Sequence, residues 1–291
     1  MKYIFGILLL ILAALIIVIF QLPDNNLHII ACDVGQGDAI LITYKNIQIL
    51  TDGGPDNKVT NCLSRYMPFW DRKIELVIST HPDADHSTGL IEVLKRYKVD
   101  NIMINPIDSG TPTIKALENQ VGSHGIPITH PVEGMGIGVG LIRLDIVSPS
   151  QDLVNGLTDK IEGNKLGFFT PLEGTNVYSI VYRLDFGNFK ALFPGDINSS
   201  VSDRLASENK IGTVNYIKIP HHGSNDGLTE NLLKALMPKM AIISVGKNNL
   251  FGHPTPQIIK MLTEQNIKIY RTDEVGDVEV ITNGNEFWVK K

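Results

Sequence analysis

The sequence is poor in cysteine. Only Cys32 and Cys62 occur among 291 residues, and they do not form a Cys-x-x-Cys pair. This spacing argues against a zinc site built from cysteines. A disulfide between the two would suit an oxidising compartment, but two buried thiols that pack as small hydrophobic side chains are the interpretation we prefer.

Clustered positive charge is also scarce. The formal net charge is -5, with 26 Lys and Arg against 31 Asp and Glu. Basic residues occur only in short groups such as Lys95 and Arg96, which are typical of solvated surfaces. Because nucleic-acid-binding domains usually carry a basic patch or stripe, the charge gives no support to a DNA partner, although it does not exclude one.

Repeats and long linkers are missing as well. The only polar break is residues 23–26, so residues 23–291 are expected to form one domain. Glycine-rich or polar stretches predict loops at 134–140 and 150–174. Period-2 and period-3.6 patterns alternate elsewhere and predict an α/β fold. The predicted strands are 27–32, 39–44, 47–51, 75–80, 141–147, 177–186, 189–193, 214–219, 240–245, 267–270 and 278–281, and the predicted helices are 86–97, 113–123, 200–208, 229–236 and 255–265.

One long apolar run is present, at the N-terminus. No charged residue occurs between Tyr3 and Leu22, and about 20 apolar residues in a helix cross the bilayer core. We therefore expect residues 1–22 to be a transmembrane anchor. A cleaved signal peptide is the alternative, but the run is long for one and lacks a small-x-small cleavage site. Lys2 before the run and Asp24 after it place the domain outside the cytoplasm.

Ligand-type side chains are concentrated in residues 81–86, which follow the predicted strand 75–80. In an extended turn, His81 and Asp83 point to the same side, whereas Asp85 and His86 open the next helix. Two imidazoles and two carboxylates so close together repel or compete unless a cation lies between them. The segment therefore predicts a divalent metal site.

Three further loops carry similar groups after predicted strands, which is where α/β folds gather functional residues. Asp196 follows a Gly turn and offers a carboxylate that could bridge two ions. His221 and His222 form a pair in which one is a ligand and the other orients it or protonates a leaving group; the sequence does not choose between them. His253 is a candidate ligand or general acid.

Three aspartates lie early in the chain beside glycines. Asp33 and Asp38 flank the first glycine-containing loop, and Asp52 precedes Gly53 and Gly54. Each either braces a backbone turn or holds a histidine ligand in place. For Asp52 the bracing role is the preferred interpretation, and for Asp33 and Asp38 the two roles are equally supported.

Taken together, these segments resemble the metallo-β-lactamase superfamily, and most closely the extracytoplasmic C-terminal domain of ComEC competence (DNA-uptake) proteins. The resemblance is carried, in the family's order, by Asp33-Val34-Gly35-Gln36-Gly37-Asp38-Ala39, Thr51-Asp52-Gly53-Gly54, residues 81–86, Pro194-Gly195-Asp196, Pro220-His221-His222-Gly223-Ser224 and Gly252-His253-Pro254. It implies an αββα four-layer sandwich with one or two divalent ions, Zn²⁺ or Mn²⁺, at one edge. The implied metal ligands are His81, Asp83, Asp85, His86, Asp196, His221 and His222, and the implied catalytic residues are Asp85, His222 and His253.

The sequence departs from the superfamily at two positions. The common loop is His-x-His-x-Asp-His, but Asp83 stands at the second histidine, and no histidine occurs between His130 and Asp196. ComEC-type domains share both departures. They make the His81 and Asp83 side the weaker metal position. A carboxylate in place of an imidazole shifts preference towards Mn²⁺, although Zn²⁺ keeps the higher intrinsic affinity.

Three functions are compatible with this pattern. The first is hydrolysis of phosphodiesters, with DNA as the substrate and metal-activated water as the nucleophile. The second is hydrolysis of a small ester, lactone, amide or phosphate ester, which the acidic net charge favours. The third is a non-catalytic accessory domain in DNA uptake, which the missing histidines favour. ComEC proteins also carry a multi-helix channel, and a single apolar segment cannot replace it.

Overall fold

The computed structural model describes residues 2–107, 109–158 and 174–290, and two β-sheets form its centre. In these residues the first sheet has the strand order β17 (Phe287–Val289), β16 (Val278–Thr282), β1 (Leu27–Ala31), β2 (Ile40–Tyr44), β3 (Ile47–Thr51), β5 (Leu76–Ser79), β7 (Ile102–Ile104) and β8 (Ile128–Thr129). The second has the order β15 (Lys268–Arg271), β14 (Met240–Ile243), β13 (Tyr216–Lys218), β12 (Phe189–Phe193), β11 (Val181–Phe186), β10 (Ile142–Ser148) and β9 (Gly136–Val139). A small ladder pairs β4 (Lys73–Ile74) with β6 (Lys98–Val99).

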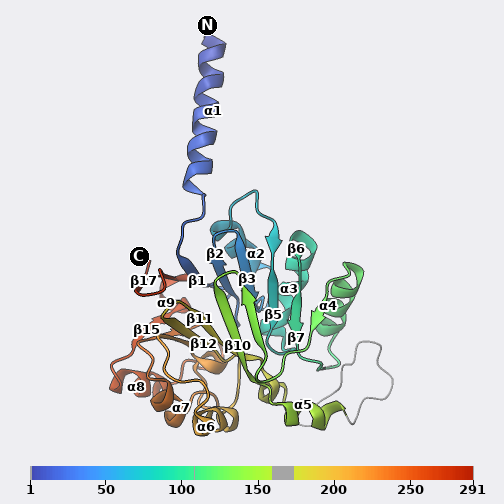
Figure 1. Cartoon of the computed structure of the whole chain (residues 1–291), viewed down its shortest axis with the longest axis vertical. Coiled ribbons are helices and arrows are strands. Elements are labelled where there is room, and N and C mark those ends of the chain that lie inside the picture. Colours follow the sequence, from blue (N-terminus) through green and yellow to red (C-terminus); the bar gives the residue numbers. More distant parts are fainter. Residues whose placement is uncertain (1, 108, 159–173, 291) are drawn as a thin grey trace.

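Helices cover the outer face of each sheet. One apolar cluster lies between the sheets, and two others join each sheet to its helices. The first sheet is covered by α2 (Lys58–Tyr66), α3 (Ala84–Arg96) and α4 (Pro112–Ser123), and the second by α6 (Ser199–Glu208), α7 (Glu230–Leu236) and α8 (Pro256–Glu264). Figure 1 shows these two groups of helices on different sides of the sheets. The predicted αββα sandwich is therefore confirmed, and the short elements α5 (Gln151–Thr158), α9 (Thr272–Val275), η1 (Thr175–Tyr178) and η2 (Pro220–Gly223) complete it.

The side chains of the central strands show why each sheet is covered on both faces. Along β5, Leu76 and Ile78 enter the core between the sheets, whereas Val77 enters the core beneath the helices. This alternation follows from the two-residue period of a strand, and both faces are apolar because both are buried. β5 runs parallel to β3 and β7, and β12, β13 and β14 run parallel to one another. The loops that follow parallel strands therefore gather at one edge of each sheet.

Several predicted loops and boundaries are corrected by the structure. The segment 134–140, predicted as a loop, contains β9, which pairs with β10 as an edge strand. The segment 150–174 begins with α5, and its residues 159–173 lie outside the described residues. The strand predicted at 177–186 begins only at Val181, because Thr175–Tyr178 forms a 3₁₀ turn.

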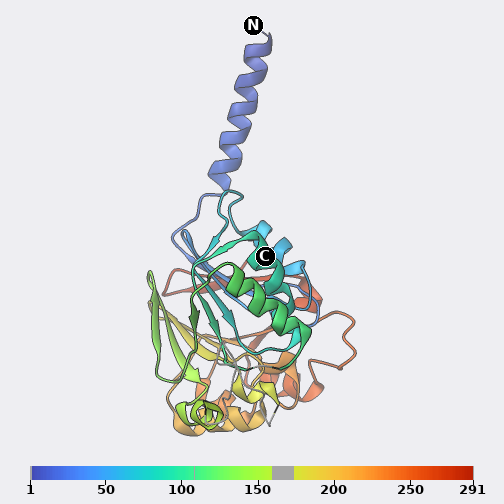
Figure 2. The same ribbon diagram turned by 90° about the vertical axis from the view of Figure 1, so that its right-hand side faces the viewer.

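The N-terminal helix α1 (Lys2–Phe20) projects away from the sandwich, as both views show (Figures 1 and 2). Among the described residues, no helix combines the length and the apolar character that a membrane crossing requires. The transmembrane anchor predicted for residues 1–22 is therefore not supported by the structure.

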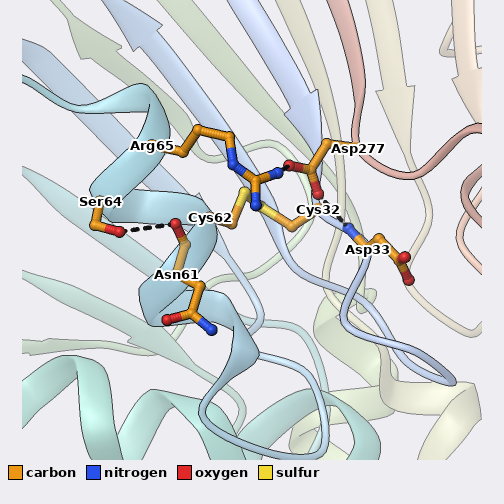
Figure 3. The surroundings of a disulfide bond; sticks show 7 residues. All are labelled: Cys32, Asp33, Asn61, Cys62, Ser64, Arg65 and Asp277. Carbon is orange, nitrogen blue, oxygen red and sulfur yellow. Dashed lines mark hydrogen bonds and ion pairs between the residues drawn. A yellow bond between two sulfur atoms is a disulfide. The ribbon is translucent and has the colours of Figure 1, made fainter.

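The two cysteines form a disulfide, which corrects our preference for free thiols (Figure 3). It joins Cys32, directly after β1, to Cys62 in α2, with a Cα–Cα distance of 5.9 Å that lies in the normal range for such a bond. Beside it, Asp277 forms an ion pair with Arg65 and accepts the backbone N–H of Asp33 at 2.8 Å. The disulfide thus links α2 to the end of β1, close to the loop that bears Asp33.

Candidate metal centre

The loop after β5 runs directly into α3 and places four ligand-type side chains in sequence. Asp83 is the residue before the helix, so Asp85 and His86 lie in its first turn, as predicted. The backbone N–H of Gly53 donates to His86 O at 2.7 Å, which ties this turn to the end of β3. A Cβ at Gly89 would lie 1.9 Å from Gly53 O, so only glycine allows the helix to approach this closely.

Four donor atoms from both sheets converge on one point. Asp196 Oδ2 lies 3.2 Å from His86 Nε2 and 3.2 Å from His222 Nε2. Asp85 Oδ2 lies 3.3 Å from His222 Nε2 and 3.8 Å from His86 Nε2. Four nitrogen and oxygen donors around one tetrahedral ion are separated by ~3.4 Å, given metal–ligand bonds of about 2.0–2.2 Å. The spacing of this four-donor cluster (Asp85, His86, Asp196 and His222) therefore fits a single divalent ion.

The far side of each imidazole is held by a hydrogen bond. His86 Nδ1 lies 2.9 Å from Asp52 Oδ2, and His222 Nδ1 lies 3.0 Å from Ser244 O. Asp52 in turn accepts the N–H of Thr80 at 2.8 Å and its hydroxyl at 2.7 Å. Both rings therefore carry the proton on Nδ1 and present Nε2 to the cluster. His86 Nε2 is buried, and Asp196 Oδ2 lies 3.2 Å from it.

A buried lysine supports the cluster from below. Lys218, the last residue of β13, is 1% exposed and forms an ion pair with Asp38. Its Nζ also lies 3.4 Å from Asp196 Oδ1, which accepts the backbone N–H of His221 at 3.2 Å. Asp196 is thus held through Oδ1 and faces the cluster with Oδ2. Lys218 was not predicted, although a single lysine in an apolar strand three positions before a histidine pair is a usable signal.

Carboxylates and imidazoles shift one another's pKa values within the cluster. Burial lowers the pKa of His86, but the carboxylates of Asp196 and Asp52 outweigh burial and raise the pKa well above its ordinary value. Burial acts likewise on His222, and Asp196 and Asp38 raise its pKa well above the ordinary value. Burial would raise the pKa of Asp196, yet His222 and His86 hold it well below its usual range. The carboxylates of the cluster therefore favour positive charge at the two imidazoles, and a metal ion would compete with protons for their Nε2 atoms.

The other half of the loop, with His81 and Asp83, brings fewer metal-ligand atoms together. His81 Nε2 lies 3.7 Å from Asp83 Oδ2, but no third donor within the described residues joins them at the spacing of the four-donor cluster. Asp83 Oδ1 accepts the hydroxyl of Thr175 at 2.7 Å, and His81 Nδ1 lies 3.0 Å from Thr80 Oγ1. Burial and the neighbouring His86 lower the pKa of His81.

The structure places the remaining predicted residues around this centre. Asp38 contacts Lys218 and the ring of His222, and Asp52 contacts the ring of His86. Asp33 is exposed, and its carboxylate accepts the N–H of Gly35. His221 turns away from the cluster, with Nδ1 3.2 Å from Asp226 O. His253 lies beside His221 at a ring distance of 5.9 Å, further from the four donors. Asp33, His221 and His253 are therefore not brought into the cluster.

A family model covers most of this architecture. The model described as the Metallo-beta-lactamase superfamily matches residues 32–247, which include all four donors. The chain belongs to the metallo-beta-lactamase superfamily. The superfamily fold also appears among solved structures: the metallo-beta-lactamase fold protein YhfI from Bacillus subtilis is similar over 91% of this chain and 100% of its own, with 11% identity and a TM-score of 0.56.

Curated relatives of this superfamily member come from competence systems. It is 23% identical to ComE operon protein 3 of Bacillus subtilis over 85% of this chain and 32% of that protein. It is 25% identical to Recombination protein 2 of Haemophilus influenzae over 95% of this chain and 31% of that protein. These are ComEC-like competence proteins, so the predicted resemblance is confirmed. The chain spans about a third of the length of the curated relatives it matches.

Proposed function

We propose that the chain is a metal-dependent phosphodiesterase that cleaves DNA outside the cytoplasm and uses one divalent ion, Mn²⁺ or Zn²⁺. The observation that carries this proposal is the convergence of the Asp85, Asp196, His86 and His222 donor atoms at 3.2–3.8 Å. When bound, such an ion lowers the pKa of its water to about 7 and offsets charge on phosphate oxygens.

The chain's own residues prepare this chemistry in three ways. Asp52 and the carbonyl of Ser244 fix the imidazole orientation, so the rings need no rearrangement when an ion arrives. Lys218 holds Asp196 through the oxygen that does not face the cluster. His253 is a candidate proton relay, because burial and the neighbouring His221 lower its pKa and keep its ring neutral at pH 7.

The substrate and the location are supported by separate observations. The competence relatives favour DNA, because one of them carries the name Recombination protein 2. The Cys32–Cys62 disulfide favours an oxidising compartment, since cytosolic thiols are kept reduced. We take residues 23–291 as the catalytic domain; the family match lies inside this range.

The test is cleavage of single-stranded DNA by the purified chain with Mn²⁺ or Zn²⁺. Activity should require added metal and should fall at least about 1,000-fold in Asp85→Ala, because a ligand is lost. Asp33→Ala is the matched control, since it removes an exposed aspartate outside the cluster. The proposal fails if DNA stays intact with either metal, if Asp85→Ala cleaves as well as the parent, or if only small esters are hydrolysed.

A further inference from the structure

The loop between β14 and α8 borders the metal centre and is held in a fixed shape. At its start, a Cβ on Gly246 would lie 2.8 Å from the backbone nitrogen of Gln36, so the loop packs tightly on the first glycine-rich turn. Inside the loop, the Asn249 side chain donates to Gly246 O at 3.0 Å and to His253 O at 2.8 Å, and accepts the His253 N–H at 3.0 Å. These hydrogen bonds therefore hold the backbone of the loop in place on both sides of its tip.

The tip carries apolar side chains that contact little of the protein. Leu250 is 98% exposed and Phe251 is 69% exposed. Lys247 is also exposed and makes no ion pair with any residue that the structure describes. A braced loop that presents an aromatic ring and a free ammonium group to solvent has the two groups needed to bind a nucleotide, because the ring can stack on a base and the ammonium can pair with a phosphate.

A series of rings connects this tip to the metal centre. The rings of Phe251 and His253 are stacked, with centroids 5.9 Å apart and an angle of 26°. The His253 ring lies 5.9 Å from that of His221, which lies 6.4 Å from the ring of the donor His222. Phe251 is thus the outermost ring of a continuous series that begins at the four-donor cluster.

We propose that Phe251 stacks on an unpaired nucleobase adjacent to the phosphate that reaches the four-donor cluster, and that Lys247 contacts a neighbouring phosphate. The inference rests on the proposed function, and it specifies single-stranded nucleic acid as the substrate class, since a base inside a duplex is not free to stack on a side chain. Stacking uses the face that all bases share, so the site tolerates any sequence.

The test measures binding in the absence of metal, so that it does not depend on catalysis. The full chain in EDTA is titrated into a fluorescent single-stranded oligodeoxynucleotide and into the same oligonucleotide with abasic sites. Phe251→Ala should weaken binding of the normal strand by about tenfold and binding of the abasic strand by less than about twofold. Phe251→Trp should retain affinity, and its indole fluorescence should be quenched only by the strand with bases.

One control variant, Phe69→Ala, and one further test variant, Lys247→Ala, complete the experiment. Phe69→Ala removes another exposed aromatic ring, 58% exposed and next to the N-terminal linker, and should change neither affinity. Lys247→Ala should make the negative slope of log affinity against log salt concentration less steep by about one on both strands. Equal losses on both strands in Phe251→Ala, or no loss on either, would overturn the proposal. Base-dependent binding without cleavage in metal would instead contradict the proposed function alone.

Discussion

The two halves of the loop 81–86 carry the same kinds of side chain but meet different partners. Asp85 and His86 face Asp196 and His222, which come from loops of the second sheet. His81 and Asp83 face hydroxyl groups, and no third metal donor among the described residues joins them. In this chain, a ligand-rich segment joins a candidate metal cluster only where the opposite sheet supplies further donors.

The pKa values of the histidines in the two halves also differ. The carboxylates around His86 overcome burial and raise its pKa, whereas burial and the neighbouring His86 lower the pKa of His81. One histidine therefore lies in a negative potential that attracts a cation, and the other lies where a positive charge is disfavoured. The contrast favours a cation beside His86 over one beside His81.

Removing a donor of the four-donor cluster should have the largest effect. Asp196→Asn deletes the carboxylate that both histidines contact, so DNA cleavage should fall at least about 1,000-fold and metal content should fall close to zero. Metal analysis by mass spectrometry and a cleavage assay measure the two effects. Asp203→Asn, an aspartate of α6 bound to Asn231, is the matched control and should change neither.

Removing the buried cation should affect stability next. Lys218→Met leaves the carboxylates of Asp38 and Asp196 buried without their ammonium partner, which should cost about 3–5 kcal/mol in the free energy of unfolding. Urea denaturation of the metal-free protein measures this. A loss below about 1 kcal/mol, the value expected of an exposed ion pair, would contradict the role assigned to Lys218.

The dependence of metal affinity on pH tests the contrast in protonation. The neighbouring carboxylates raise the pKa values of His86 and His222, so protons compete with a metal for each Nε2. Metal affinity should therefore rise with pH, and calorimetry in buffers of different ionisation enthalpy should detect proton release on metal binding. Release of no proton would contradict the assignment, since His81, with its lowered pKa, has none to lose.

Changing the other half of the loop should have the smallest effect. His81→Ala should keep one ion per chain and should change metal affinity by less than about tenfold, the lower end of the loss seen when a group beyond the ligands is removed. Equilibrium dialysis with Mn²⁺ measures both quantities. A loss of all bound metal in this variant would show that the two halves are equivalent.

Sequence periodicity was sufficient to predict most of the sandwich. Strands such as β3 and β12 lie within the ranges expected from their apolar patterns, because both of their faces are buried. The edge strand β9 was missed, since it needs only backbone pairing with β10 and its glycines give no apolar pattern. The helix α2 was missed too; it is short and carries four polar or basic residues besides its buried ones.

The four donors of the cluster were among the predicted metal ligands, but their contacts were not predicted. His221 and His222 both have left-handed backbones, with φ of 50° and 52°, a conformation that the sequence pattern did not indicate. The partners of Lys218 lie in other strand-end loops, so no local pattern reveals its ion pairs. The Cys32–Cys62 disulfide spans a separation of 30 residues and depends likewise on the packing of α2.

Anomalous scattering from crystals of the protein grown with Mn²⁺ or Zn²⁺ locates each ion and its ligands together, and so distinguishes one metal position from two. We expect one peak per chain, bounded by Asp85, His86, Asp196 and His222. A second peak at His81 and Asp83, a single peak there, or no peak at all would contradict it.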